Sequence, residues 1–95
     1  MSSDAAIDAV ARSLAGQDGM LGIRVFFDMN SAMALPDRRL EVLRTVMFPV
    51  VRGERWSYHT APVADVVWYA ARVTPREYSM LLSARVFDGV RVVIE

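Results

Sequence analysis

The sequence contains no cysteine and no lysine, and its only histidine is His59. The lack of cysteine excludes a disulfide framework, a thiolate zinc site and a cysteine nucleophile. A lone histidine, without a second imidazole or a thiolate, also leaves a transition-metal site within one chain short of its usual ligands. We therefore expect no metal and no other cofactor.

An excess of either charge is also missing, because eleven arginines balance eleven acidic residues and the net charge at pH 7 is +0. Such a chain has no long-range attraction for nucleic acid or for an anionic membrane, although the balance does not exclude a local basic face. The longest apolar run is far too short to span a bilayer, and the first residues lack the apolar core of a secretory signal. We expect a cytoplasmic protein that does not bind membranes.

Apolar residues are abundant and make up 54% of the 95 residues. We treat residues 1–95 as a single domain. A domain of this size buries about two thirds of its unfolded surface, so these side chains do not all fit into one core. The excess predicts an apolar surface that is covered in an oligomer or by a partner.

An N-terminal helix is predicted over residues 1–16, in front of a core formed by residues 22–95. Its apolar residues recur at helical spacing and form one stripe: Ile7, Val10, Ala11 and Leu14. Three residues of this stripe are candidate contacts with another part of the protein or with a partner: Ile7, Val10 and Leu14.

Two further helices are predicted over residues 35–48 and 74–85. Pro36 and Pro75 suit the first turn, where the missing N–H costs nothing. Thr74 and Glu77 have the spacing of a capping box. Apolar stripes predict which side chains face the core: Leu40, Leu43, Val46 and Met47 in the first helix, and Tyr78, Leu81 and Leu82 in the second.

Four segments have the β-branched and aromatic composition of strands. They cover residues 22–30, 50–60 (a strand, or a hairpin around Gly53), 64–74 and 90–95. The order is helix, then βαββαβ, which predicts an α+β fold of the ferredoxin-like split βαβ type, an antiparallel four-stranded sheet with an extra N-terminal helix. A helix over residues 62–73 is the alternative, and it would give a mostly helical domain with a helix-turn-helix.

Side chains alternate along a strand, so the strands predict one apolar face under the helices and one mixed face. Arginines, large aromatic residues and the histidine collect on the mixed face, and these are the candidate binding residues: Arg24, Phe26, Arg55, His59, Trp68, Arg72 and Arg91. A solvated face does not usually carry residues such as Phe26 and Trp68, so we expect something to cover it. The N-terminal helix, a second copy of the chain and a different partner are the three alternatives.

Catalytic chemistry has little support in the sequence. Ser57 and His59 share the mixed face and lie two residues apart on the same strand. We expect side chains at this spacing to be too poorly aimed for a catalytic pair. Asp28 lies near the end of the first strand, where some small split-βαβ nucleases of CRISPR adaptation carry an aspartate that holds a metal across a dimer. A hydrogen bond to local backbone, or a pair with Arg24, is the structural interpretation of the same residue.

The sequence thus predicts a small non-enzymatic protein-protein interaction module. We expect it to form a homodimer through the mixed face or through the N-terminal helix. A nucleic-acid-binding domain is the alternative, with RNA or single-stranded DNA stacked on Phe26 and Trp68 or with a helix-turn-helix. A small metal-dependent nuclease that uses Asp28 is a further alternative.

Overall fold

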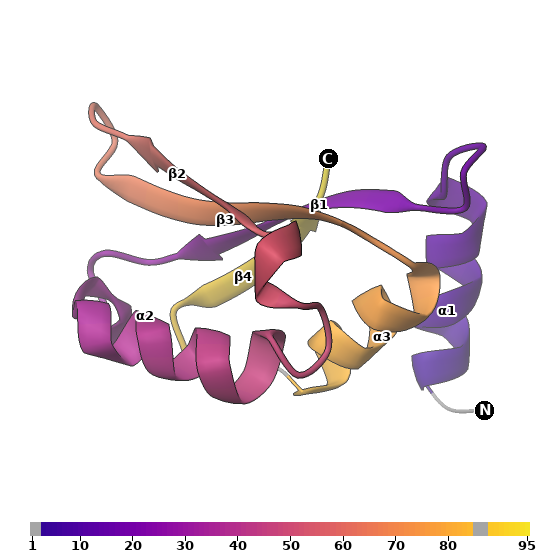
Figure 1. Ribbon diagram of the computed structural model, residues 1–95, viewed down its shortest axis with the longest axis horizontal. Helices are drawn as coiled ribbons and strands as arrows, with labels where there is room; N and C mark the ends of the chain where they lie inside the picture. Colours follow the sequence, from indigo (N-terminus) through magenta and orange to yellow (C-terminus); the bar gives the residue numbers. More distant parts are fainter. Residues whose placement is uncertain (1–2, 85–87) are drawn as a thin grey trace.

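The computed structural model describes residues 3–84 and 88–95, which form an α+β domain (Figure 1). Three α-helices and four strands follow one another along these residues: α1 (Ser3–Leu14), β1 (Leu21–Phe27), α2 (Pro36–Val42), β2 (Ser57–Ala61), β3 (Val66–Val73), α3 (Pro75–Ala84) and β4 (Val90–Ile94). Three short helical turns lie between them: η1 (Ala32–Ala34), η2 (Leu43–Met47) and η3 (Gly53–Arg55).

The four strands form one sheet in the order β2-β3-β1-β4, and every neighbouring pair is antiparallel. The prediction of an antiparallel four-stranded sheet with three helices is confirmed. β1 and β3 are the central strands, while β2 and β4 form the two edges. Helices α2 and α3 lie below one face of this sheet in Figure 1, so the sheet has a helix side and an opposite side.

The helical alternative for residues 62–73 is wrong, and with it the helix-turn-helix. β3 forms instead, because its β-branched and aromatic residues favour a strand and alternate between two environments. Val67, Ala71 and Val73 are buried on the helix side. Residues 62–65, where the alternative helix would begin, form a turn that joins β2 to β3.

The strand predicted over residues 50–60 begins later in the structure. Residues 50–56 are not extended throughout, because η3 turns the chain and the strand begins only at Ser57. The indole Nε1 of half-buried Trp56 donates a hydrogen bond to the Val51 carbonyl at 2.9 Å and closes this turn. No hairpin forms around Gly53.

The core lies between the sheet and α2, η2 and α3. Its largest fully buried side chains include Phe27, Ile23 and Val25 of β1. The predicted helix over residues 35–48 is present as α2 continued by the π-helical turn η2, and Leu43 and Met47 are buried as expected. Leu40 is the exception, being 40% exposed, because it lies at a surface groove beside Tyr58 of the edge strand β2, where the sheet ends.

Helix α1 packs against α3 at one end of the molecule (Figure 1). Ala11 is fully buried, whereas Val10 and Leu14 are 56% and 55% exposed. Of the three alternatives for covering the mixed face, the one in which this helix folds back onto Phe26 and Trp68 is therefore wrong. A compact turn explains the position of α1. The N–H of Gly16 donates a hydrogen bond to the Met20 carbonyl at 3.0 Å, and this turn leads the chain directly from α1 into β1.

The predicted capping box at the start of α3 is confirmed. The Glu77 N–H donates to Thr74 Oγ1 at 3.1 Å, and the Thr74 N–H donates to Glu77 Oε1 at 2.8 Å. The same carboxylate accepts two hydrogen bonds from the Arg55 guanidinium, at 2.8 and 3.0 Å. Glu77 thus joins the turn before β2 to the start of α3, and these two segments are far apart in the sequence.

We expect Glu77→Gln to lower the free energy of unfolding by about 1–2 kcal/mol at neutral pH. Burial raises the pKa of the Glu77 carboxyl, but the hydrogen bonds from Arg55 and from the Thr74 backbone outweigh it and leave the pKa lowered. A carboxyl with a lowered pKa in the folded state stabilises the protein above its unfolded pKa, and this contribution is lost as the pH falls through the folded value. The deficit of the variant in urea unfolding should therefore shrink toward about pH 3.

Glu54→Gln is the matched control, because Glu54 pairs with Arg52 on the surface at 3.2 Å. Both side chains of that pair are largely exposed, so its removal should change the free energy of unfolding by less than about 0.5 kcal/mol. Equal effects of the two substitutions, or a Glu77→Gln deficit that does not depend on pH, would contradict a stabilising role for the Glu77 carboxylate.

Candidate functional site

Four side chains form a continuous row across the mixed face, one from each strand. The register pairs Phe26 of β1 with Arg91 of β4 and with Trp68 of β3, and it pairs Trp68 with His59 of β2. We call these four residues the aromatic row. None of the described helices covers it, since α2 and α3 lie on the other side of the sheet and α1 packs against α3 at one end of the molecule.

The members of the aromatic row contact one another through their flat groups. The Arg91 guanidinium lies 5.2 Å from the Phe26 ring centroid, and the rings of Phe26 and Trp68 are 5.7 Å apart at 32°. The His59 ring stacks on Trp68 at 5.4 Å and 13°. The members of the row cover one another in part through these contacts, and Phe26 and Trp68 are half-buried as a result.

Two of the predicted arginines on this face are neutralised within the domain. Arg24 lies 6.0 Å above the Trp68 ring and pairs with Glu95 at 3.0 Å. Arg72 pairs with Asp18 at 2.6 Å; the Met20 N–H, and then Arg72, lower the pKa of that carboxyl. Among the residues that the structure describes, Arg91 has no acidic partner.

Arg55 lies apart from the aromatic row, contrary to the prediction. It belongs to η3 rather than to β2, and its guanidinium binds the Glu77 carboxylate and the Arg72 carbonyl. The predicted extended backbone over residues 50–56 would have placed it among the other arginines, but the turn redirects it toward α3. Its charge is therefore neutralised at the start of that helix.

Ser57 and His59 are closer than the sequence predicted. Ser57 Oγ lies 2.9 Å from His59 Nε2, so the expectation that they are poorly aimed is wrong. Ser57 Oγ is also 3.3 Å from the Ala70 carbonyl, which competes for the hydroxyl proton. In residues 3–84 and 88–95 no carboxylate hydrogen-bonds the His59 ring, so this pair lacks the third group that orients a catalytic base.

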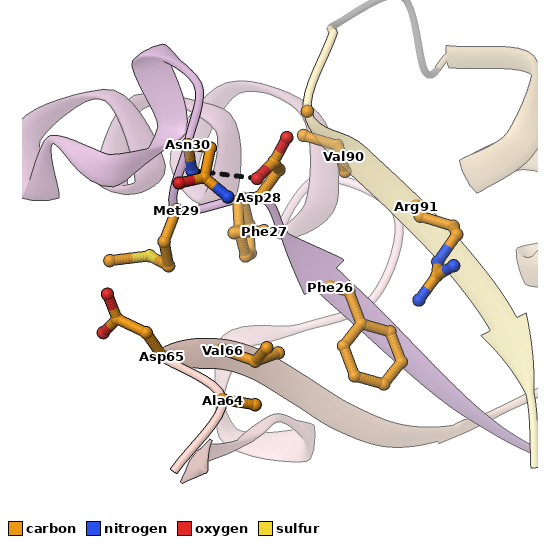
Figure 2. Close-up of a pocket in the computed structure, with 11 residues that line it drawn as sticks. Phe26, Phe27, Asp28, Met29, Asn30, Ala64, Asp65, Val66, Val90 and Arg91 are labelled. Carbon is orange, nitrogen blue, oxygen red and sulfur yellow. Dashed lines mark hydrogen bonds between the residues drawn. The ribbon is translucent and has the colours of Figure 1, made fainter. Parts of the chain in front are cut away.

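A pocket of about 430 Å³ opens where β1 ends (Figure 2). Its lining comes from the end of β1, the β2–β3 turn and the start of β4: Phe26, Phe27, Asp28, Met29, Asn30, Ala64, Asp65, Val66, Gly89, Val90 and Arg91. Asp28 Oδ1 accepts the Asn30 N–H at 2.8 Å, which confirms the predicted hydrogen bond to local backbone. The alternative pair of Asp28 with Arg24 is wrong, because Arg24 binds Glu95.

Asp65 is a pocket residue that sequence reasoning missed. It ends the β2–β3 turn with φ of 52°, in the left-handed region that aspartate tolerates better than most residues. Its side chain lies on the opposite side of the pocket from Arg91 (Figure 2). The signal was present in the sequence APVAD, but it indicates a turn only if strands flank it on both sides.

Within the described part of the chain, no group of three or more His, Cys, Asp or Glu side chains could hold a metal ion. The predicted alternative places Asp28 in a metal site shared across a dimer, and it stays a prediction. No helix among those residues is both long and apolar enough to cross a bilayer. Comparison with family models, with curated proteins and with solved structures found no match.

Proposed function

We propose that this domain is a small non-enzymatic interaction module that self-associates by packing its mixed face against the mixed face of a second copy. The observation that carries this proposal is the aromatic row, which places half-buried Phe26 and Trp68 on the two central strands with no described helix above them. Val93 on the same face is 37% exposed and adds apolar surface beside the row. Apolar surface of this kind is typical of a contact face.

The charges of the face favour a protein partner over nucleic acid. A phosphate backbone is bound by cations that release counterions, and each cation already paired with a carboxylate contributes less. Arg24 and Arg72 are paired in this way, which leaves Arg91 as the one arginine predicted on the face that has no acidic partner within residues 3–84 and 88–95. The net charge of +0 also means that no long-range repulsion opposes the approach of a second copy.

A two-fold arrangement suits the chemistry of the row. In an isologous dimer every contact is made twice, so a self-complementary patch is required. The row offers planar rings in its centre and a guanidinium at one end, and a guanidinium stacks on an aromatic face of either copy. Arginine and aromatic residues are also the residues enriched at the centres of protein interfaces.

Light scattering of the whole chain over a range of concentrations tests this proposal, and we expect a dimer that dissociates on dilution. Val93→Arg adds a charge that the interface would have to desolvate, so we expect dimer affinity to fall by about tenfold or more. Met80→Arg is the control, because Met80 is exposed on α3, on the helix side. It should leave the dimer unchanged.

Val10→Arg separates the two predicted contact surfaces, since Val10 is exposed on α1. If the mixed face is the contact, this variant dimerises like the unmodified chain. A chain that is monomeric at every concentration, or a dimer that Val10→Arg disrupts and Val93→Arg does not, would contradict self-association through the mixed face.

Binding of single-stranded RNA or DNA is the second candidate function, and one observation favours it. Phe26 and Trp68 are direct neighbours on the two central strands, where two stacked bases could lie on their rings. This function predicts a salt-dependent affinity for single-stranded oligonucleotides that Trp68→Ala abolishes. Fluorescence anisotropy at low salt measures it, and the absence of binding there would rule it out.

The connectivity supports the finer assignment of the fold, and we propose the ferredoxin-like split βαβ arrangement for residues 21–95. Each half contributes a strand, a helix and a second strand, and the strand order β2-β3-β1-β4 leaves the first strand of each half in the centre of the sheet. A solved structure whose strands pair in another order would overturn this assignment. The cytoplasmic location stays a prediction from composition.

A further inference from the structure

The pocket at the end of β1 gathers three charged groups that are unpaired within the described residues. Asp65 makes no hydrogen bond or ion pair there, and Asp28 uses only Oδ1, which accepts the Asn30 N–H. Arg91 contacts the Phe26 ring but no carboxylate. Elsewhere on the sheet Arg24 and Arg72 have acidic partners, so Arg91 is the one arginine of the described strands without an acidic partner.

The three charges are separated in space around the pocket. Figure 2 shows Arg91 and the Phe26 ring on one side, Asp65 with Met29 on the other, and Asp28 between them. Phe26, Met29 and Val66 provide apolar lining between the charged groups. A volume of about 430 Å³ is within the range of small-molecule sites.

We propose that this pocket binds a free basic amino acid, lysine or arginine. Its α-carboxylate would bind the Arg91 guanidinium, its α-ammonium the free oxygen of Asp28, and its side-chain cation Asp65. Two carboxylates and one guanidinium give the pocket a net charge of the opposite sign to that of such a ligand. The aliphatic stem of the ligand lies against the apolar lining, as long cationic side chains do.

The order of charges distinguishes this ligand from simpler ones. An amino acid carries its carboxylate and α-ammonium on the same carbon, and Asp28 lies between Arg91 and Asp65 in Figure 2, so such a ligand would direct these two groups toward Arg91 and Asp28. The distant cation matches Asp65 across the pocket. A diamine has no carboxylate to bind Arg91, and an amino acid with an apolar side chain has no side-chain cation to bind Asp65.

Isothermal titration of the full chain at low ionic strength with L-lysine tests the proposal, with cadaverine, norleucine and Nα-acetyl-lysine as analogues. Each analogue lacks one of the three charged groups. We expect each to bind about tenfold or more weakly than lysine, since each loses a hydrogen bond between charged groups. Equal affinity for Nα-acetyl-lysine would show that the pocket takes the C-terminal lysine of a peptide, and would overturn the free amino acid as ligand.

Variants of the pocket should give a crossed pattern. Arg91→Gln should weaken lysine about tenfold and leave cadaverine unchanged, whereas Asp65→Asn should weaken both. Asn tolerates the left-handed backbone at this position, so the turn is kept. Asp37→Asn on the exposed surface of α2 is the control and should change neither affinity. No saturable heat with lysine up to about 50 mM, or no response to Arg91→Gln, would overturn the proposal.

Self-association and ligand binding share Phe26 and Arg91, so lysine affinity is measured at a concentration at which the chain is monomeric. Trp68 does not line the pocket, and Asp65 is not in the row. Trp68→Ala should therefore alter the solution mass and leave lysine affinity unchanged, whereas Asp65→Asn should do the reverse. Failure of either proposal can thus be recognised without reference to the other.

Discussion

Phe27→Ala should lower the free energy of unfolding by about 3–5 kcal/mol, the largest effect that we expect from a single substitution in this protein. Phe27 is 1% exposed on the helix side of β1, and its ring meets the Tyr69 ring edge to face at 5.6 Å and 80°. Alanine would remove the buried ring and leave a cavity that the close-packed neighbours refill only in part. Equilibrium unfolding in urea measures the loss.

Phe26→Ala is the matched control, because Phe26 is the neighbouring residue on the opposite face of the same strand. It is half-buried on the mixed face, where the ring contacts Trp68 and Arg91 but no helix covers it. We expect a loss of about 1 kcal/mol. If Phe27→Ala does not fold, Phe27→Leu should still fold with a loss of about 1–2 kcal/mol. Losses of the same size for Phe26→Ala and Phe27→Ala would contradict the assignment of the two faces.

Gly89→Ala should lower the free energy of unfolding by about 2–4 kcal/mol. Gly89 has φ of 86°, a conformation that L side chains rarely adopt, and an added Cβ would collide with the Ser31 hydroxyl. That hydroxyl accepts the Met33 N–H at 3.1 Å and donates to the Asp28 carbonyl at 2.7 Å. The substitution would therefore strain the backbone and also displace a side chain that caps η1.

Gly19→Ala separates these two causes. Gly19 has a similar φ of 75°, but no atom lies within 4 Å of an added Cβ. Only backbone strain remains, and we expect a loss of about 1 kcal/mol. Urea unfolding of both variants measures the difference between them, which is the cost of displacing Ser31. A Gly19→Ala loss as large as that of Gly89→Ala would show that the collision with Ser31 contributes nothing.

The two surfaces discussed above differ in how their charges are satisfied. On the mixed face Arg24 and Arg72 are neutralised by Glu95 and Asp18, so the face presents stacked rings with little net charge. In the pocket Arg91 faces carboxylates that have no cationic partner in the described chain. The first arrangement favours a partner with apolar and planar groups, and the second favours a small ligand with separated charges.

Local patterns in the sequence were enough to predict most of the secondary structure. The spacing of Thr74 and Glu77 predicted the capping box, because a cap is made by residues three apart on one helical turn. The alternation along residues 66–73 predicted which side chains of β3 share a face, because the period of a strand is two. Phe26, Trp68 and Arg91 could be assigned to one face for the same reason.

Contacts between distant segments could not be predicted in this way. Gly53 indicates a turn within residues 50–60, but nothing in the local pattern indicates that this turn is helical and directs Arg55 to Glu77 rather than to the other arginines. The position of α1 beside α3 depends on the compact turn before β1, although the apolar stripe of the helix fits either side of the sheet.

The candidate sites depend most on tertiary structure. Whether Phe26 lies opposite Trp68 and Arg91 is decided by strand register, and a shift of one residue would move each of these side chains to the other face. Asp65 and Arg91 meet around one pocket only because β2, β3 and β4 are placed on either side of β1. Periodicity and caps act over a few residues, so the sequence alone indicates them, whereas register and strand order are set by packing of the whole core.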